Sequence, residues 1–382
     1  MNESQNAKFT VYENRKKKPK VLLIGALPPP FMGPTLATEV ILNSGFLKER
    51  CEVLHFDVSD SRDLSTLGNL DFFNIFGAVR SYFSLIMYLF RLKPDIVYLQ
   101  INQTTLGFMR DSIYVIISAL FKKTKIVLHL RGGNFRNWYD KCTRLMQFYV
   151  RLIYKFVSSQ IVLGDTLKSM FDGILPVEKL SVIPNGKDIT FGVKKNDDDK
   201  IRILFAANMT ETKGIKNVMR VIPNIMKKTN FPLEFHFIGA DVEKSTSNWI
   251  KEFCKKNNDL PLFFHGAKIG NEKYNIFIQS DIFLFPTYYA PEGHPWVIIE
   301  AMAAGLPIIS TDQGAIIESV VNGYNGIITA KFDIDVISRD LLSLINSSEL
   351  RKRFGENSKK MYLKSFTEKN MIKGLIDVFE KQ

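Results

Sequence analysis

Short apolar runs alternate with longer segments of helical periodicity along most of this chain. The apolar runs lie at 21–26, 51–59, 94–100, 125–130 and 159–165, and again at 200–209, 231–240, 260–269, 281–286 and 306–311. Runs that are apolar throughout are typical of parallel strands buried on both faces of a sheet. Because strands and helices alternate in this way twice, the sequence predicts two doubly wound α/β domains whose strand ends face a common cleft.

The predicted helices differ in how they would be buried. Helical patterns are expected at 35–50, 72–92, 145–157, 332–348, 349–365 and 368–381. The segment 72–92 has too many apolar positions for one buried stripe. Two interpretations of it remain open: a helix buried on most sides, or a helix with an exposed face that touches lipid or a lipid-linked acceptor.

Polar segments mark the expected domain boundaries. We predict a polar lead-in at 1–19, an N-terminal Rossmann-like domain at 20–190, a C-terminal Rossmann-like domain at 191–365 and a final helix at 366–382. A polar linker at 194–200 follows the turn formed by Asn185 and Gly186. A length of 382 residues also exceeds what one compact core usually holds.

The net charge of +12 is uneven, because most of the excess of Lys and Arg lies in the first half of the chain. A basic surface can attract nucleic acid, anionic lipid or a phosphorylated substrate. No nucleic-acid-binding module accompanies the charge, so nucleic acid is not expected as a partner. The basic run at 14–20 is interpreted as a solvated lead-in, with a contact to anionic lipid as the alternative.

The sequence predicts a cytoplasmic protein. Its polar start lacks the apolar segment of a signal peptide, and no run of about 18 apolar residues would span a membrane. The three cysteines are far apart and are expected to be reduced thiols.

The stretch 281–330 combines the features of a phosphate site. The apolar run at 281–286 is followed by a turn-rich loop and by a helical segment that a glycine and a proline end. A glycine loop that leads into a helix N-terminus aims backbone N–H groups at an anion. Two acids, Glu292 in the loop and Glu300 in the helix, stand eight positions apart.

This pattern resembles the C-terminal nucleotide-sugar site of retaining glycosyltransferases of the GT-B fold, of the family four type. The matching residues are Glu292, Gly293, Pro295, Glu300, Ala301, Ala304, Gly305, Pro307, Gly314, Glu318, Gly323 and Gly326. The resemblance is strong in the C-terminal half and loose in the N-terminal half. It implies a nucleotide-sugar donor on the C-terminal domain, an acceptor on the N-terminal domain, and a last helix that packs back on the N-terminal domain.

The resemblance implies that two glutamates hold the donor. Glu300 is expected to accept hydrogen bonds from both ribose hydroxyls. Glu292 is expected to contact the hydroxyls of the donor sugar and to steady positive charge at the anomeric carbon, and whether it also acts as a nucleophile stays open. Their neighbours are further donor-binding candidates: Gly293, His294, Pro295 and Trp296. The indole would either stack on the sugar or pack the loop.

Lys213 is predicted to neutralise the diphosphate. It lies at the start of a helical segment, where a lysine without a bound anion would be unfavourable beside the positive end of the helix dipole. The family has an arginine five residues earlier, where Asn208 stands in this chain. Asn208 is still included among the donor-binding candidates, and Gly266 is expected beside the nucleotide base.

Residues of the N-terminal half complete the predicted site. His129 ends a strand before a glycine loop and would face the donor sugar. Arg131 would hold an acceptor phosphate or pair with a local acid. Gly33 lies where the backbone would approach the donor, but Pro34 removes one N–H donor that the family often has there.

No metal ion or cofactor is expected. Asp333 and Asp335 are interpreted as the polar start of a helix, and the acids at 197–199 as part of the solvated linker. Lys213 and a helix N-terminus would then stabilise the leaving diphosphate without a metal.

Together these features predict a metal-independent retaining glycosyltransferase. It would move a sugar from a UDP- or GDP-sugar to a glycan or lipid-linked acceptor in bacterial surface polysaccharide biosynthesis, and peripheral contact with anionic membrane is a further hypothesis. The alternative is a catalytically idle nucleotide-sugar-binding module, which Asn208 and Pro34 favour. A phosphorolytic enzyme is disfavoured, because no motif marks a lysine for a pyridoxal cofactor.

Overall fold

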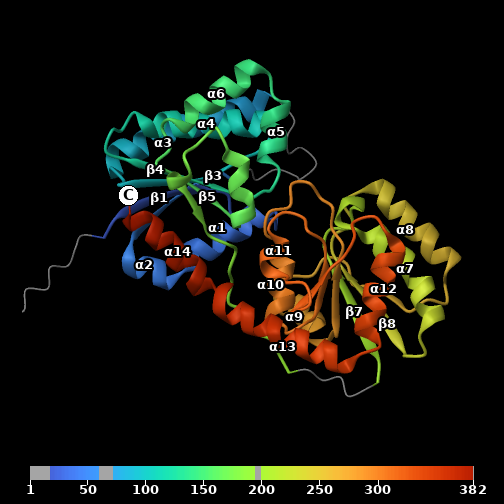
Figure 1. The fold of residues 1–382 in the computed structure, drawn as a ribbon. Helices are drawn as coiled ribbons and strands as arrows, with labels where there is room; N and C mark the ends of the chain where they lie inside the picture. Colours follow the sequence, from blue (N-terminus) through green and yellow to red (C-terminus); the bar gives the residue numbers. More distant parts are fainter. Residues whose placement is uncertain (1–17, 60–71, 194–198, 382) are drawn as a thin grey trace, which may run out of the picture.

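The computed structural model describes residues 18–59, 72–193 and 199–381. Within these residues the chain forms two domains, each built around a six-stranded parallel sheet (Figure 1). The predicted fold of two Rossmann-like domains is therefore confirmed. The basic run at 14–20 and the acids at 197–199 lie largely outside the described residues.

The N-terminal sheet has the strand order β2-β1-β3-β4-β5-β6. Its strands are β1 (Lys20–Gly25), β2 (Glu52–Asp57), β3 (Ile96–Ile101), β4 (Lys125–Leu130), β5 (Ser159–Val162) and β6 (Leu180–Val182). Its helices are α1 (Gly33–Asn43), α2 (Gly45–Arg50), α3 (Phe72–Leu92), α4 (Thr105–Ala119), α5 (Phe135–Lys141) and α6 (Arg144–Tyr154).

Both faces of this sheet are buried. Along β1, Leu22 and Ile24 pack in one cluster with residues of α3, α4 and α6, whereas Val21 and Leu23 pack on the opposite side with residues of α1, α2 and α14. This two-sided burial explains why the strands are apolar throughout rather than alternating with polar residues.

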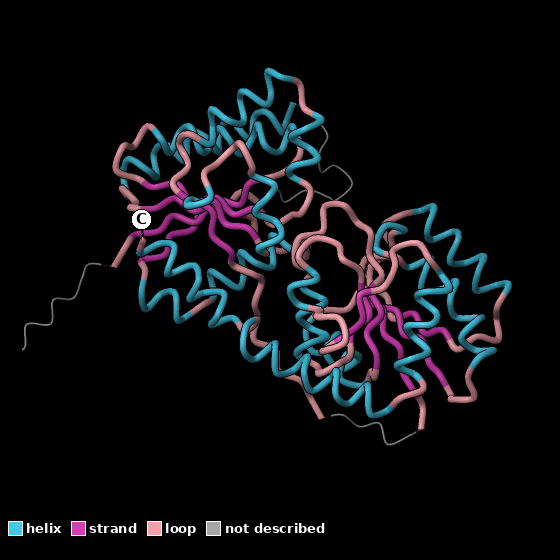
Figure 2. Tube along the Cα trace, viewed as in Figure 1, coloured by secondary structure: helices cyan, strands magenta, loops and turns pink. Residues whose placement is uncertain are grey.

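The C-terminal sheet has the strand order β12-β11-β10-β7-β8-β9, and helices enclose it as well (Figure 2). Its strands are β7 (Ile201–Ala206), β8 (Leu233–Ile238), β9 (Leu262–Phe264), β10 (Ile282–Phe285), β11 (Ile308–Ser310) and β12 (Gly326–Ile328). Its helices are α7 (Ile215–Lys228), α8 (Lys244–Lys256), α9 (Gly270–Gln279), α10 (Trp296–Ala303), α11 (Ile316–Ser319), α12 (Ile334–Ile345) and α13 (Ser348–Ser365).

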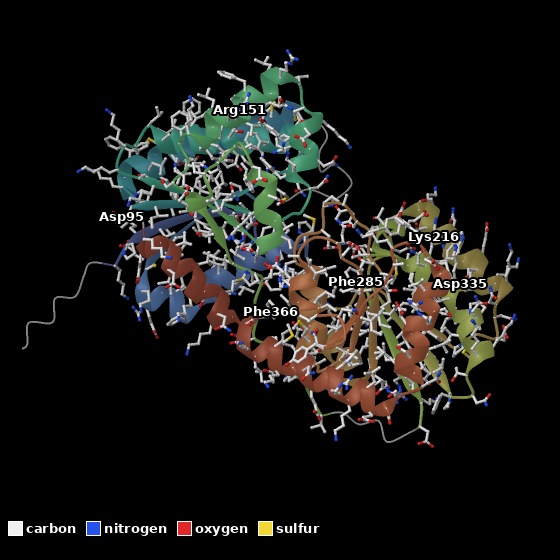
Figure 3. All side chains as sticks on the ribbon, viewed as in Figure 1. Asp95, Arg151, Lys216, Phe285, Asp335 and Phe366 are labelled. Atoms are coloured by element: carbon white, nitrogen blue, oxygen red, sulfur yellow. The ribbon has the colours of Figure 1, made fainter. Side chains whose placement is uncertain are left out.

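The chain crosses between the domains twice, and the two crossings lie side by side. The last helix, α14 (Glu368–Glu380), lies on the N-terminal domain, where Ile372 is fully buried. Phe366 lies between α13 and α14 at the junction of the domains (Figure 3), and its carbonyl accepts from the Lys187 N–H at 3.2 Å. The Glu368 N–H donates to Asp188 Oδ1 at 3.0 Å.

Each sheet has one point where the strand order reverses. This switch point lies between β1 and β3 in the first sheet and between β7 and β10 in the second. The connections that leave neighbouring strands there turn to opposite faces of the sheet, so a crevice forms at the carboxyl edge. The loops after β7 and β10 are therefore the expected positions of ligand-binding residues.

One predicted helix is interrupted. The pattern at 35–50 suggested a continuous helix, but α1 ends at Asn43, Ser44 has extended backbone angles, and α2 begins at Gly45. Asn, Ser and Gly all have low helix propensity, which explains the break inside a run with helical periodicity.

Candidate active site

Two oppositely charged side chains meet at the switch point of the C-terminal sheet. Lys213 follows β7, and Glu292 lies in the loop at 286–295, termed here the acid loop, which follows β10. Lys213 Nζ lies 2.5 Å from Glu292 Oε2. The side chain of Glu292 is 9% exposed and that of Lys213 is 21% exposed, so the pair is largely shielded from water.

The surroundings of this pair are polar and aromatic. Thr287 donates a hydrogen bond from Oγ1 to Glu292 Oε2 at 3.3 Å. The ammonium of Lys213 lies 4.4 Å from the ring centroid of Tyr289, within the range of a cation–π contact. Burial and the nearby Glu292 carboxylate raise the pKa of Tyr289, so its hydroxyl stays protonated.

The start of α7 adds unpaired N–H groups to this position. Gly214 follows Lys213 directly, has φ of +90° and forms the N-cap of α7, with no side-chain cap. A Cβ at Gly214 would lie 2.3 Å from the Pro286 carbonyl oxygen, so only glycine allows this turn to pack against the acid loop. Lys213 and a helix N-terminus thus meet at one place, an arrangement suited to a phosphate group.

The second predicted acid, Glu300, is buried in α10 and paired with a lysine that the sequence did not suggest. Lys273 Nζ of α9 lies 2.5 Å from Glu300 Oε2. The side chains are 19% and 9% exposed respectively, so the carboxylate is held from one side by a cation. No motif marks Lys273, because it lies on another helix and reaches Glu300 only through the tertiary fold.

Glycines allow two other segments to pack tightly on the acid loop. A Cβ at Gly133 would lie 2.0 Å from the Glu292 carbonyl oxygen, and one at Gly314 would lie 2.3 Å from the same atom. The Gly133 N–H also donates to the Pro291 carbonyl at 3.0 Å. The N-terminal domain therefore contacts the acid loop through backbone, at the residues directly beside Glu292.

His129, at the end of β4, is fully buried and neutral. Burial and the nearby Arg131 charge lower its pKa well below the ordinary value of 6.5. Arg131 Nη2 donates to the Tyr98 oxygen at 3.1 Å, which directs the Tyr98 proton to His129 Nδ1, 2.8 Å away. The imidazole proton then lies on Nε2, which has no hydrogen-bond partner among the described residues. The site thus contains one buried N–H donor available to a ligand.

Arg131 is hydrogen-bonded to neutral side chains and not to a local acid, and its predicted contact with an acceptor phosphate stays a prediction. Its Nη1 donates to Asn185 Oδ1 at 2.5 Å and its Nη2 to Tyr98, so both terminal nitrogens are used inside the protein. Asn185 was expected only to form a turn. Its side chain instead connects Arg131 to His294, since Asn185 Nδ2 donates to the His294 carbonyl at 2.7 Å.

His294 lies in the contact between the domains. The Asn185 N–H donates to His294 Nδ1 at 3.2 Å, so the imidazole proton lies on Nε2 and is donated to Ser319 Oγ at 2.5 Å. Burial lowers the pKa of His294 to about 3, which keeps the ring neutral. Both ring nitrogens are occupied, so the donor-binding role predicted for this residue has no free nitrogen in this structure.

The side chain of Trp296 packs against other residues of the protein. Its indole Nε1 donates to the Gly33 carbonyl at 3.2 Å, and the ring packs against buried residues of both domains. Gly33 is the first residue of α1 and Pro34 the second, so the missing N–H falls in the first turn of that helix. This contact joins the first residue of α1 to the first residue of α10 across the domain boundary.

The remaining predicted residues lie along the carboxyl edge of the C-terminal sheet. Asn208 is exposed after β7, and Gly266 follows β9 with φ of +69°. The Gly239 N–H, after β8, donates to the Gly266 carbonyl at 2.9 Å, which aligns the loops after β8 and β9. Pro295 is buried and is the N-cap residue of α10, directly before Trp296.

The acidic pair considered as a metal site has a structural role. Asp333 is the N-cap of α12, and its Oδ1 accepts from the Asp335 and Val336 N–H groups at 3.0 Å. Within the described residues no group of three or more His, Cys, Asp or Glu side chains is arranged to hold a metal ion.

Comparisons with known proteins agree with this geometry. Residues 186–361 match the family described as glycosyl transferases group 1. An uncharacterised glycosyltransferase of Methanocaldococcus jannaschii is 26% identical over 334 residues, which cover 81% of this chain and 80% of that protein. The capsular polysaccharide biosynthesis glycosyltransferase CapM of Staphylococcus aureus is 28% identical over 171 residues, 44% of this chain and 43% of that protein.

The fold has a solved counterpart. The crystal structure of HepE from Anabaena in complex with UDP aligns with a TM-score of 0.71 and 15% identity, covering 95% of this chain and 100% of that chain. At this identity the likeness concerns the fold, and it extends over both domains.

Proposed function

We propose that this chain, which is a group 1 glycosyltransferase of the GT-B fold, transfers a sugar from a nucleoside diphosphate sugar to a glycan or lipid-linked acceptor with retention of anomeric configuration. The observation that carries the proposal is the Lys213–Glu292 pair, held at the switch point beside the N-terminus of α7. A cation and free N–H groups suit the diphosphate, and an adjacent carboxylate suits the sugar.

In the proposed reaction, the bond between the anomeric carbon and the diphosphate oxygen breaks, and the acceptor oxygen bonds to the same face of that carbon. The acceptor proton passes to the departing diphosphate oxygen, so the products are a glycoside and a nucleoside diphosphate. Lys213 and the first turn of α7 stabilise the negative charge that develops on the leaving group. When the diphosphate binds the ammonium of Lys213, Glu292 becomes free to accept from hydroxyls of the donor sugar.

Two further residues are proposed to fix the donor. Glu300 accepts from the ribose hydroxyls, and Lys273 orients its carboxylate. His129 donates from Nε2 to a hydroxyl of the donor sugar, because that N–H is buried and otherwise unpaired.

We propose the substrates from the chemistry of the site and from the names of similar proteins. UDP- and GDP-sugars are the donors to test first, and the HepE structure with UDP supports a uridine donor. CapM, which acts in capsular polysaccharide biosynthesis, supports an acceptor of bacterial surface polysaccharide assembly. Because nucleotide sugars are cytoplasmic metabolites, we place the reaction on the cytoplasmic side of the cell.

The experiment is a turnover assay with the full chain. UDP- and GDP-sugars are incubated with glycan acceptors in EDTA, and release of nucleoside diphosphate is measured, with NMR of the product to assign the anomer. We expect release in the presence of chelator, and a loss of about 100-fold or more in kcat for Glu292→Gln. Glu211→Gln, at the exposed start of the same helix region, is the matched control and should leave kcat unchanged.

The idle binding module predicts a different result. A nucleotide sugar would raise the melting temperature, no nucleoside diphosphate would be released with any acceptor, and Glu292→Gln would change no product. Activity that is lost in EDTA and restored by Mn²⁺ would contradict metal independence while leaving glycosyl transfer intact.

A further inference from the structure

Three neighbouring helices of the N-terminal domain expose apolar side chains on their outer surface. α3, α4 and α6 lie over one face of the first sheet (Figure 1). Side-chain contacts join them: Tyr82 and Tyr114 pack edge to face, and Ser112 Oγ lies 2.7 Å from Tyr149 OH. We name their solvent side the outer face. Its exposed apolar residues are Phe83, Ile86, Met87, Phe90, Leu106, Met109, Ile116, Leu145, Phe148 and Leu152.

Within each helix these residues are spaced so that most of them lie on one face. Apolar residues exposed by chance would be scattered around the helix. Among residues 80–92 of α3 the exposed apolar positions are 83, 86, 87, 88 and 90, of which Tyr88 packs against Phe56 of β2. In α4 they are 106, 109 and 116, and in α6 they are 145, 148 and 152. Each helix therefore has one apolar stripe toward the sheet and another toward solvent. Phe90 is 70% and Leu145 is 78% exposed, so the side chains extend into solvent rather than lying against the protein. Clustered exposure of this kind marks an interaction site.

The charges around the outer face are almost all positive. Across the sequences of the three helices the one acid is Asp111, which is buried and lies 2.7 Å from Arg110 Nη2. Arg91, Arg144 and Arg151 are exposed, and Arg151 lies on α6 in the outermost layer of helices (Figure 3). A second copy of the chain would bring like charges together, whereas an anionic lipid surface complements both the apolar stripes and the arginines.

We propose that the outer face docks on the surface of an anionic lipid bilayer, with its apolar side chains inserted at the level of the headgroups and its arginines paired with phosphate. The contact is peripheral, since none of the helices in the described residues is long and apolar enough to cross a bilayer. Of the two interpretations of segment 72–92, this proposal adopts the helix with an exposed face that touches lipid.

One end of the outer face lies near the acid loop. Gln103, two residues before α4, accepts from the Asn134 N–H at 2.9 Å through its side-chain oxygen. Gly133, which precedes Asn134, donates to the Pro291 carbonyl of the acid loop. The exposed stripe of α4 begins at Leu106, three residues after Gln103. If the proposed function holds, a lipid-linked acceptor at the bilayer surface would therefore lie beside the catalytic cleft. Bilayer docking itself does not depend on that function.

The test is co-sedimentation of the full chain with vesicles of phosphatidylglycerol and phosphatidylcholine, compared with phosphatidylcholine alone. We expect binding only to the anionic vesicles and a decrease as NaCl is raised. The triple variant Phe83→Gln, Met87→Gln, Phe90→Gln should lose roughly tenfold or more in the partition coefficient. The matched control carries the same change at exposed apolar positions of the other domain, Phe231, Val242 and Leu363.

A second measurement separates docking from misfolding. Tryptophan introduced as Phe90→Trp should show a blue-shifted emission when anionic vesicles are added, whereas Leu363→Trp should not. Equal vesicle binding by the triple variant and the control would overturn the proposal, as would wild-type protein that stays in the supernatant. A dimer that the triple variant converts to monomer, without vesicle binding by either, would show that the outer face pairs with a second copy instead. Turnover on a water-soluble acceptor tests the proposed function separately.

Discussion

Replacing Lys213 by methionine removes one positive charge and keeps the length and apolar stem of the side chain. If the ammonium holds the leaving diphosphate, a charged hydrogen bond worth about 1.5–3 kcal/mol is lost, which corresponds to a roughly 10- to 150-fold weaker Kd for free UDP or GDP. Isothermal titration with whichever nucleotide binds wild-type protein measures this change. Lys200→Met is the control, since Lys200 lies directly before β7, at the opposite end of that strand from Lys213, and forms an exposed pair with Glu234.

The same substitution should also lower stability, because it leaves the Glu292 carboxylate buried without its cation. Breaking a fully buried pair costs about 3–5 kcal/mol. Lys213 keeps 21% exposure and Thr287 still donates to the carboxylate, so we expect less, about 2 kcal/mol, or roughly 4–8 °C in Tm for a domain of this size.

A double variant distinguishes the two effects. Adding Glu292→Gln to Lys213→Met removes the unpaired charge and should restore most of the Tm, but nucleotide affinity should stay low. Glu292→Gln alone should bind free nucleoside diphosphate at least as tightly as wild type, because the ammonium no longer has a competing carboxylate. Recovery of nucleotide affinity in the double variant would refute the reasoning, since Lys213 would then act only by holding Glu292.

Three further predictions concern the neighbours of this pair. Lys273→Met should raise KM for the nucleotide sugar about tenfold with little change in kcat, because ribose contacts act equally in ground and transition states. Gly133→Ala should cost about 1–3 kcal/mol and lower kcat, because the new methyl meets the Glu292 carbonyl. The pKa of His294 is lowered to about 3 from 6.5, so the unfolded chain takes up a proton that the folded chain does not. Its contribution to stability is therefore complete above pH about 6.5 and falls by up to roughly 1.4 kcal/mol per pH unit towards pH 3 in denaturant titrations.

Each of these predictions has a control or a contradicting result. Lys268→Met, which removes an exposed pair with Glu272 near the same helix, should leave KM unchanged. Gly45→Ala, where a Cβ would meet nothing within 4 Å, should not lower Tm, because alanine favours the helix that begins there. If His294→Asn folds and shows the same dependence of stability on pH as wild type, His294 is not the group that titrates.

The fold could be predicted from local patterns because parallel strands buried on both faces are apolar throughout. Val21 to Ile24 form such a run, and the same pattern recurs in both domains. The acid loop could be placed because it follows a buried apolar run and because its residues match the pattern of the family that this stretch resembles. Glu292 and Lys213 then meet because the strands before them are neighbours at the switch point.

The interactions that fix these groups could not be predicted from single segments. Lys273 reaches Glu300 from a different helix, and Asn185 joins Arg131 to His294 across the domain boundary. From the sequence alone, Lys273 is explained as a surface lysine of a helix and Asn185 as an asparagine in a turn. Their roles depend on distances between elements, which hydrophobic periodicity does not specify.

The paired crossings of the chain restrict how the two domains move. A Cβ at Gly186 would lie 2.3 Å from the Thr367 carbonyl oxygen, and Lys187 is hydrogen-bonded to Phe366, so the outgoing and returning segments are packed against each other. Two adjacent tethers define a single rotation axis, and they resist sliding and twisting of one domain over the other. We therefore expect any separation of the domains to turn about residues 186–188 and 366–368, and to open the interface most at the edge farthest from that axis.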